Sequence, residues 1–309
     1  MRIVYLGTPD FAVLPLKSLV ESGKYEIVGV VTNLDKPVGR KQVLTPPPVK
    51  VQAEEFGIKV YQPQTLKNGE GIEILKETNP DVVIVVAYGK ILPKDFLEFT
   101  KYGCINIHGS ILPQYRGAAP IQRCVLDGEE YAGVTAMQMD VGLDTGDVLL
   151  VEKTKIGENE TSGELFERLA DMGAELLIKT LDKLQKGELV PEKQNDEEST
   201  YASMLDKSMS PVDWSKSAQQ IHNQIRGLDP WPVALTMYNG KTLKLFRSYI
   251  DASIGNGEAG SVKNVKEGLA VFCGDGKAVV VTEVQFEGKK RMKAADFLRG
   301  NPIPDGFCF

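Results

Sequence analysis

Three polar side chains have the types and the spacing that acyl transfer needs. Asn106 and His108 stand two apart in CINIH, a short run that alternates like a strand and ends in a glycine. Side chains two apart on a strand share a face, so the amide and the imidazole are expected to point into the same space. Asp144 follows a second alternating run, in the loop VGLDTGD, where two glycines permit tight turning.

An amide, an imidazole and a carboxylate can carry out acyl transfer without a side-chain nucleophile. The amide and a protonated imidazole can donate hydrogen bonds to the oxyanion of a tetrahedral intermediate. The carboxylate can keep the imidazole charged and help to take a proton from an attacking amine. No serine or cysteine has an evident base beside it, so direct attack by the acceptor is the simpler interpretation. On spacing alone, a structural role for His108 stays open.

The elements around these residues predict an α/β fold. RIVYLG, EIVGVVT and the almost wholly apolar DVVIVVAY have the character of strands, and helical patterns separate them. Such alternation favours a Rossmann-like, mostly parallel sheet covered on both faces. In these sheets ligands bind beyond the carboxyl ends of strands, where His108 and Asp144 are expected. Gly7 lacks the other glycines of the G-x-G-x-x-G pattern, which excludes a dinucleotide site.

The rest of the chain predicts one long helix, a linker and a second domain. The stretch TSGELFERLADMGAELLIKTLDKLQKGE has helical periodicity and capping-box spacing at Thr161 and Glu164. A polar, aperiodic stretch follows, and then a helix whose His222 lies off the apolar face and is expected at the surface. Later strand patterns, including an Asn-Gly hairpin turn, indicate a small barrel. The predicted boundaries are 1–189 for the catalytic domain, 190–206 for the linker and 207–309 for the barrel.

Basic residues gather in two places. Residues 36–50 contain four basic residues and no acidic one, and their prolines predict an exposed, mobile loop without regular structure. Such a loop is either a solvated surface or an arm that contacts phosphates. The net charge is −6, but the last third of the chain holds more basic than acidic residues, with a cluster at Lys289, Lys290, Arg291 and Lys293. This cluster has the same two interpretations.

Composition places the chain among ordinary globular proteins. Hydrophobic residues make up 42% and charged residues 25% of the 309 residues, a length that suits two domains. No apolar run approaches a membrane span and no leader peptide is evident. Four cysteines are scattered without metal-ligand spacing. We therefore expect a reduced cytoplasmic protein without membrane association and without a metal site.

The site segment resembles the folate-dependent formyltransferase family. The resemblance is carried by GTPDFA near the start, VVAYGKILP, and CINIHGSILPQYRGAAPIQ through VGLDTGD. It runs from Arg2 to about Gly187 and continues more loosely to the end. Within the family, the RGAAPIQ stretch and the basic insert point to the members that act on tRNA. The family shares Asn106, His108, the SILP-type loop and Asp144, and the sequence departs from it at none of these positions.

The resemblance implies roles for particular residues. Asn106, His108 and Asp144 would be catalytic, and Ser110, Ile111, Leu112 and Pro113 would bind 10-formyltetrahydrofolate, the formyl donor, which is a cosubstrate. Ile91 and Leu92 would help to enclose its pteridine ring, although ordinary core packing explains either side chain equally well. The acceptor would be the α-amine of methionyl initiator tRNA, with Arg40 and Lys41 contacting the acceptor arm. A monomer with an OB-like barrel as its C-terminal domain is expected.

Three other functions stay open at this point. A formyltransferase acting on a small amine would use the same three residues, but it would not need the basic insert. A hydrolase would release formate from the folate with water as the acceptor. A non-enzymatic RNA-binding module would need only the C-terminal domain and would leave the Asn106–His108–Asp144 arrangement unexplained.

Overall fold

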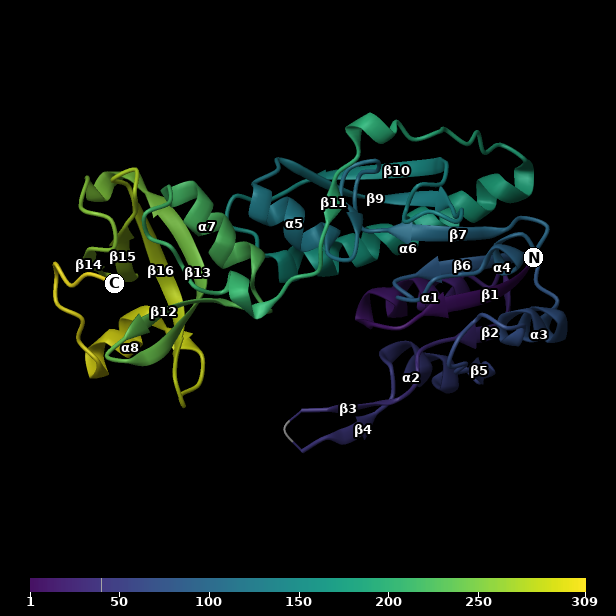
Figure 1. The fold of residues 1–309 in the computed structure, drawn as a ribbon, viewed down its shortest axis with the longest axis horizontal. Helices are drawn as coiled ribbons and strands as arrows, with labels where there is room; N and C mark the ends of the chain where they lie inside the picture. The colour runs from purple at the N-terminus through teal and green to yellow at the C-terminus, as the bar shows by residue number, and fades with distance from the viewer. Residues whose placement is uncertain (40) are drawn as a thin grey trace. The chain divides into compact units, whose positions relative to one another are not determined.

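The computed structural model describes residues 1–39 and 41–309 and divides into two compact units. The N-terminal unit comprises Met1–Gly117, Gly133–Thr154 and Phe166–Tyr201. The C-terminal unit comprises Ala118–Ala132, Lys155–Leu165 and Ala202–Phe309. Figure 1 labels the helices and strands of both units. No described helix is long and apolar enough to span a bilayer.

The N-terminal unit is built on a seven-stranded, mostly parallel sheet. The strand order is β10-β9-β7-β6-β1-β2-β5; the neighbours from β7 to β5 are parallel, and β9 runs antiparallel to β7. The strands of this sheet are β1 (Arg2–Gly7), β2 (Glu26–Val31), β5 (Val60–Tyr61), β6 (Val82–Val86), β7 (Cys104–His108), β9 (Tyr131–Gln138) and β10 (Val148–Lys155). The predicted Rossmann-like, mostly parallel sheet is confirmed.

The helices of this unit follow the strands in the expected alternation. They are α1 (Val13–Glu21), α2 (Pro48–Glu55), α3 (Glu70–Thr78), α4 (Lys94–Leu97) and α6 (Ser162–Lys186), with short 3-10 turns at Asp10–Ala12 and Asp196–Glu198. The long predicted helix is confirmed as α6. Its capping box is also present, since the Thr161 amide donates to the Glu164 carboxylate and the Glu164 amide donates to the Thr161 hydroxyl.

Strand β7 presents two chemically different faces to the layers around it. Cys104 packs in an apolar cluster with residues of α3 and α4, such as Leu75 and Phe96. Ile107 faces the other layer, because a Cβ added to Gly173 of α6 would lie 3.2 Å from its Cγ2. Side chains alternate along a strand, so Asn106 lies on the same face as Cys104. The strand thereby carries the amide on the face that α3 and α4 cover.

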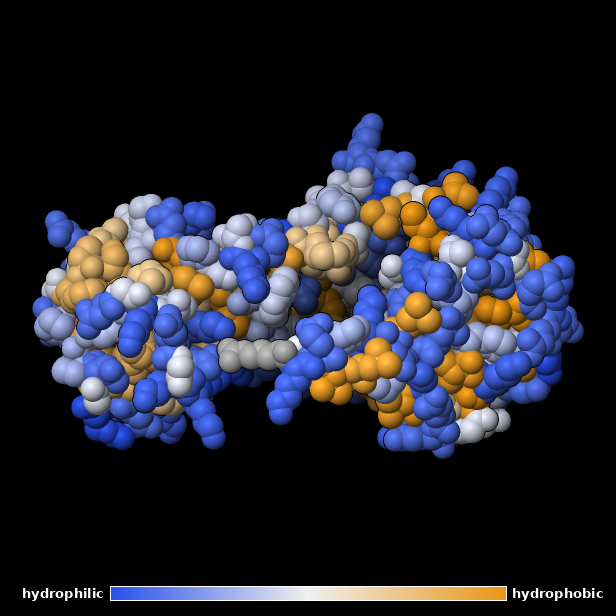
Figure 2. Space-filling view, turned by 60° about the horizontal axis from the view of Figure 1, so that its bottom comes forward, coloured by the Kyte–Doolittle hydropathy of each residue, from blue (hydrophilic) through white to orange (hydrophobic). Residues whose placement is uncertain are grey.

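The basic segment of residues 36–50 contains regular structure, so the expected irregular loop is wrong. β3 (Lys36–Val38) and β4 (Val43–Thr45) pair antiparallel with Lys36 opposite Thr45, and α2 begins at Pro48. Pro37 fits because a two-stranded ribbon leaves each strand an edge without ladder bonds. The hairpin exposes apolar side chains at Val38, Val43 and Leu44, and Figure 2 shows hydrophobic residues gathered over it.

The C-terminal unit is a β-sheet domain whose core includes buried side chains of the helices α7 and α8. Its sheet runs β12-β13-β16-β15-β14, with β17 paired to β16, and all of these neighbouring strands are antiparallel. Its elements are α5 (Pro120–Asp127), α7 (Ala218–Gly227), β12 (Ala234–Tyr238), β13 (Lys241–Asp251), β14 (Val262–Val265), β15 (Gly268–Phe272), β16 (Ala278–Phe286), β17 (Met292–Lys293) and α8 (Ala294–Gly300). The Asn-Gly turn predicted between β12 and β13 is present, with positive φ at both residues.

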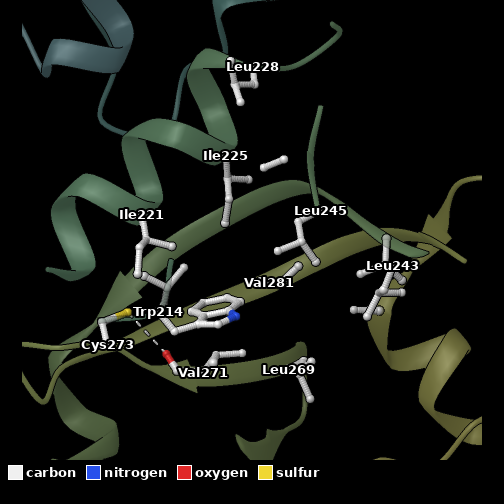
Figure 3. Packing of buried hydrophobic residues seen from close by; sticks show 14 of the residues in the cluster. Trp214, Ile221, Ile225, Leu228, Leu243, Leu245, Leu269, Val271, Cys273 and Val281 are labelled. Carbon is white, nitrogen blue, oxygen red and sulfur yellow. Dashed lines mark hydrogen bonds between the residues drawn. The ribbon is translucent and has the colours of Figure 1, made fainter. Parts of the chain in front are cut away.

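The core of this domain lies between α7 and the sheet. Figure 3 shows Ile221 and Ile225 of α7 directed towards Leu245 and Val281 of the sheet, with Trp214 between the layers. These side chains are almost fully buried. Burying apolar area of this kind contributes roughly 25 cal/mol per Å², which accounts for a stable second core.

The expectation that His222 lies at the surface is wrong, because only 2% of the residue is exposed. One ring nitrogen lies 2.8 Å from the Ser248 hydroxyl and the other lies 3.0 Å from the Glu158 carbonyl. Burial lowers the pKa of the ring. Both contacts come from segments distant in sequence, so the helical pattern around His222 could not indicate them.

Candidate active site

Asn106 and His108 stand at the carboxyl end of β7, as the sequence predicts. Their backbones pair with Met137 and Thr135 of β9, and their exposed fractions are 8% and 7%. Among the residues that the structure describes, the side-chain amide of Asn106 has no hydrogen-bond partner within the protein. The amide is absent from the fully buried, unpartnered polar atoms, so it keeps access to solvent and is available to a ligand.

The imidazole of His108 lies between two oxygen acceptors. Its Nε2 lies 2.9 Å from the backbone carbonyl of Tyr115, and its Nδ1 lies 3.8 Å from Oδ2 of Asp144. The first contact is a hydrogen bond in which Nε2–H donates. The second is too long for one and is an electrostatic contact. Both ring nitrogens therefore face acceptors, an arrangement that suits the doubly protonated ring.

Asp144 is held by its own loop and by the segment that follows His108. Its Oδ2 accepts a hydrogen bond of 2.8 Å from the Gly117 amide. Its backbone is in the left-handed region with φ +54°, which is uncommon for residues other than glycine, although aspartate tolerates it better than most. The loop is tight, since a Cβ on Gly146 would come within 1.8 Å of the Gln138 carbonyl. Asp144 is thus fixed in the direction of the imidazole.

Two residues of this network have no signal in the sequence. The side chain of Gln194 donates hydrogen bonds to the carbonyls of Asp144 and Gly146 at 2.8 and 2.7 Å. It accepts from the buried Arg116 guanidinium at 2.8 and 3.1 Å. The Thr200 hydroxyl accepts a hydrogen bond of 2.8 Å from the Tyr115 amide. Gln194 and Thr200 lie in the stretch predicted as a linker, where composition gave no indication of a role at the site.

The loop predicted to bind the donor follows directly after β7. The Thr135 hydroxyl donates to the Ser110 carbonyl at 2.7 Å and accepts from the Leu112 amide at 3.2 Å. Ser110 and Leu112 are buried, whereas Ile111 and Pro113 are half-buried. One strand residue therefore fixes the path of the loop.

Apolar side chains stand exposed on two other segments of this unit. Ile91 is 77% exposed, and Val141 and Leu143 are 72% and 59% exposed. Leu92, the other residue expected at the pteridine ring, is 6% exposed and packs in the core instead. Exposed side chains of this kind are candidates for covering a flat heterocycle.

Only one of the two predicted tRNA-binding residues is among those that the structure describes. Lys41 is described and exposed on the turn between β3 and β4, whereas Arg40 lies outside the described residues. In the C-terminal cluster, Lys289, Lys290 and Lys293 are exposed. Arg291 is engaged internally, since its guanidinium bonds Glu283 at 2.7 Å and packs 4.2 Å from the Phe246 ring centroid.

The chemistry open to this arrangement is acyl transfer by direct attack. Burial raises the pKa of the Cys104 thiol, two residues before Asn106, to about 12, which makes it a poor nucleophile. Within residues 1–39 and 41–309, no cluster of three histidine, cysteine or acidic residues is suited to hold a metal ion. The remaining groups are an unpartnered amide, an imidazole and a carboxylate, which can stabilise an oxyanion and move a proton.

The chain matches two family models that together span most of its length. Residues 1–181 match the model described as formyl transferase, and residues 204–302 match that of the formyl transferase C-terminal domain. Among curated proteins, a methionyl-tRNA formyltransferase of Citrifermentans bemidjiense is 50% identical, covering 99% of this chain and 95% of the relative. One of Alkaliphilus metalliredigens is also 50% identical, covering 99% of this chain and 97% of the relative.

Solved structures share the fold at lower identity. An N-formyltransferase of Helicobacter canadensis, solved with folinic acid and dTDP-3-aminofucose, superimposes with a TM-score of 0.70. It is 22% identical, covering 90% of this chain and 98% of that one. HypX of Aquifex aeolicus, solved with tetrahydrofolic acid, gives a TM-score of 0.63 at 19% identity, covering 96% of this chain and 47% of that one.

Proposed function

This chain belongs to the formyl transferase family, and on that premise we propose that it transfers the formyl group of 10-formyltetrahydrofolate to the α-amine of methionyl initiator tRNA, for translation initiation. The observation that carries the proposal is the 50% identity, over nearly the whole chain, to relatives named for this activity. The geometry of Asn106, His108 and Asp144 supports it, because these groups suit a reaction that passes through an oxyanion.

In the proposed reaction, the acceptor amine attacks the formyl carbon directly. The new bond forms between the amine nitrogen and this carbon, and the bond from the carbon to N10 of the folate breaks. One proton moves, in net, from the amine to N10. The Asn106 amide donates to the oxyanion, which is consistent with its lack of a partner in the protein.

His108 is the second donor to the oxyanion in this scheme. Its Nε2 is already hydrogen-bonded to the Tyr115 carbonyl, whereas Nδ1 is 3.8 Å from Asp144 and has no short hydrogen bond to it. We therefore assign the donation to Nδ1–H, on the side that Asp144 faces. The carboxylate stabilises the charged ring and takes part in moving the proton of the amine, directly or through one water.

The donor and the acceptor are assigned to different segments of the chain. Ser110, Ile111, Leu112 and Pro113 hold the folate, and the exposed Ile91, Val141 and Leu143 cover its ring. Arg40 and Lys41 contact the phosphates of the acceptor arm. The enzyme acts in the cytoplasm as a monomer, free of membranes and without a metal.

The test is to follow a labelled formyl group from the donor to its acceptor. We expect the label on methionyl initiator tRNA, and none on the same tRNA without methionine, because that tRNA has no α-amine. Parallel reactions contain amino sugars or no acceptor at all. Label on a small amine, or formate released at the same rate without tRNA, would replace the proposal with one of the two enzymatic alternatives.

A further inference from the structure

The stretch between α6 and the C-terminal sheet is attached to the candidate site at three points. Glu192 exchanges two backbone hydrogen bonds with Val148, at 2.8 and 2.9 Å, where β10 begins. Gln194 bridges the carbonyls of Asp144 and Gly146. The carbonyl of Thr200 accepts from the Arg116 amide at 2.9 Å, in addition to the contact of its hydroxyl with Tyr115. Residues 192–200 therefore form a strap across the loops that flank His108.

The strap meets these loops where the backbone is least relaxed. Asp144 and Tyr115 have φ values of +54° and +58°, a region that L-residues other than glycine enter at a cost of about 1–3 kcal/mol. Gln194 binds the carbonyl of the first, and Thr200 binds the amide of the second. Asp144 and Tyr115 in turn supply the two acceptors that face the imidazole of His108, the Asp144 carboxylate and the Tyr115 carbonyl.

Gln194 is suited to this position because its amide donates and accepts at once. Its nitrogen donates to the two loop carbonyls, and its oxygen accepts from Arg116. Arg116 is further anchored to Asp196 of the strap at 2.8 Å. A glutamate would keep the partner of Arg116 but could not donate to either carbonyl. The side chain is half-buried although most of its neighbours along the strap are exposed.

We propose that Gln194 is a positioning residue for the transfer reaction, and that the strap of residues 192–200 sets the distance between His108 and Asp144. This inference rests on the proposed function for its kinetic test, but the geometry that it concerns does not depend on the acceptor. When Gln194 no longer donates, the Asp144 loop relaxes and the carboxylate leaves the imidazole. Misplacement of a group by about 1 Å is enough to cost roughly 100-fold in rate.

Three variants separate the possible roles of the side chain. Gln194→Met keeps its length and removes all its hydrogen bonds, and Gln194→Glu removes only those that it donates. Gln224→Met is the matched control, since Gln224 is also half-buried and donates to two backbone carbonyls, those of Met209 and Pro211, at 2.8 and 3.0 Å within the C-terminal unit. For both Gln194 variants we expect kcat to fall roughly 10- to 100-fold with KM values within about threefold. The control keeps kcat near that of the wild type.

The second readout is the imidazole of His108 itself. The chain contains two histidines, so protein labelled with ¹⁵N in the histidine rings gives two sets of ring signals. His222 is the internal control, because its partners Ser248 and Glu158 lie in the C-terminal unit. We expect the ring signals of His108 to move in both Gln194 variants, while those of His222 remain in place.

Defined results would overturn the inference. A decrease in kcat of less than fivefold in Gln194→Met, or a Gln194→Glu variant as active as the wild type, excludes a positioning role through the loop carbonyls. Equal shifts of both histidines indicate a general loss of structure. If the wild type formylates another acceptor, the proposed function fails, but kcat on that acceptor and the His108 signals still decide the role of Gln194.

Discussion

Replacing Asn106 with alanine separates catalysis from folding at the candidate site. The residue is largely buried, but its side-chain amide keeps access to solvent and has no hydrogen-bond partner among the described residues, so its removal strands no donor or acceptor in the protein. The usual penalty of about 1–3 kcal/mol for an orphaned buried group is therefore avoided. What remains is the lost packing of one small side chain, for which we expect a decrease of roughly 1 kcal/mol in the free energy of unfolding.

The effect on the reaction is expected to be far larger. Removal of one donor to an oxyanion costs about 2.7–4 kcal/mol in the barrier, or roughly 10²–10³ in kcat. Asn106→Asp is expected to lose at least as much, because a carboxylate of the same size cannot donate and repels the developing negative charge. The assay is single-turnover formyl transfer to methionyl-tRNA, with both substrates saturating so that binding does not limit the rate.

The control is Cys104→Ala, which truncates a buried side chain on the same face of the same strand. This variant is expected to lose stability to a similar or greater extent and to keep its turnover. A decrease of less than about tenfold for Asn106→Ala would refute the assignment of the amide to the oxyanion. The same conclusion follows if Cys104→Ala slows the reaction as much as Asn106→Ala does.

Three further outcomes are expected. His108→Ala should reduce kcat by at least roughly 100-fold while folate binding, measured by fluorescence titration, survives; near-normal turnover would remove His108 from the mechanism. Arg40→Ala and Lys41→Ala should raise KM for methionyl-tRNA and leave KM for the donor unchanged, and equal losses for both substrates would count against tRNA contact. The hydrogen bonds from Arg247 lower the pKa of Glu164 to about 2, so this carboxylate stabilises the fold above its unfolded pKa of about 4.5 and ceases to do so as the pH falls towards 2. Glu164→Gln should therefore lower the free energy of unfolding at pH 7 by at most about 1 kcal/mol, given the exposure of the pair, and denaturation curves of the two proteins should converge near pH 2.

The sequence was sufficient for those parts of the site that depend on local periodicity. Alternation in CINIH places Asn106 and His108 on one face, and the apolar strands before it predict the parallel sheet that carries them. Local sequence also determines the capping box of Thr161 and Glu164 and the Asn-Gly turn, because each involves residues only a few positions apart. Each of these features is stabilised by residues close in sequence, so a short stretch of sequence is enough to predict it.

The features that sequence reasoning missed depend on contacts between distant segments. Gln194 meets a carbonyl 50 residues away, and Thr200 meets an amide 85 residues away. A polar, aperiodic stretch carries no trace of such partners, so a strap and a passive linker have the same composition. His222 was misplaced for the same reason, because the segment around Glu158 covers the helix face that its own pattern leaves polar. The β3–β4 hairpin was missed because proline is compatible with an edge strand.

The choice of acceptor has to be made outside the catalytic groups. A sugar N-formyltransferase shares this fold at a TM-score of 0.70, so the sheet that supports the site does not by itself select tRNA. In the proposed mechanism, Asn106, His108 and Asp144 act on the formyl carbon and the attacking nitrogen, which are common to every primary-amine acceptor. Unlike these three residues, the β3–β4 hairpin could distinguish tRNA from a small amine, because it presents exposed cations and apolar side chains next to each other. Exchanging residues 36–45 for a short neutral turn should therefore abolish transfer to methionyl-tRNA, while binding of the folate donor is retained. Unchanged transfer after this exchange would place the discrimination elsewhere in the chain.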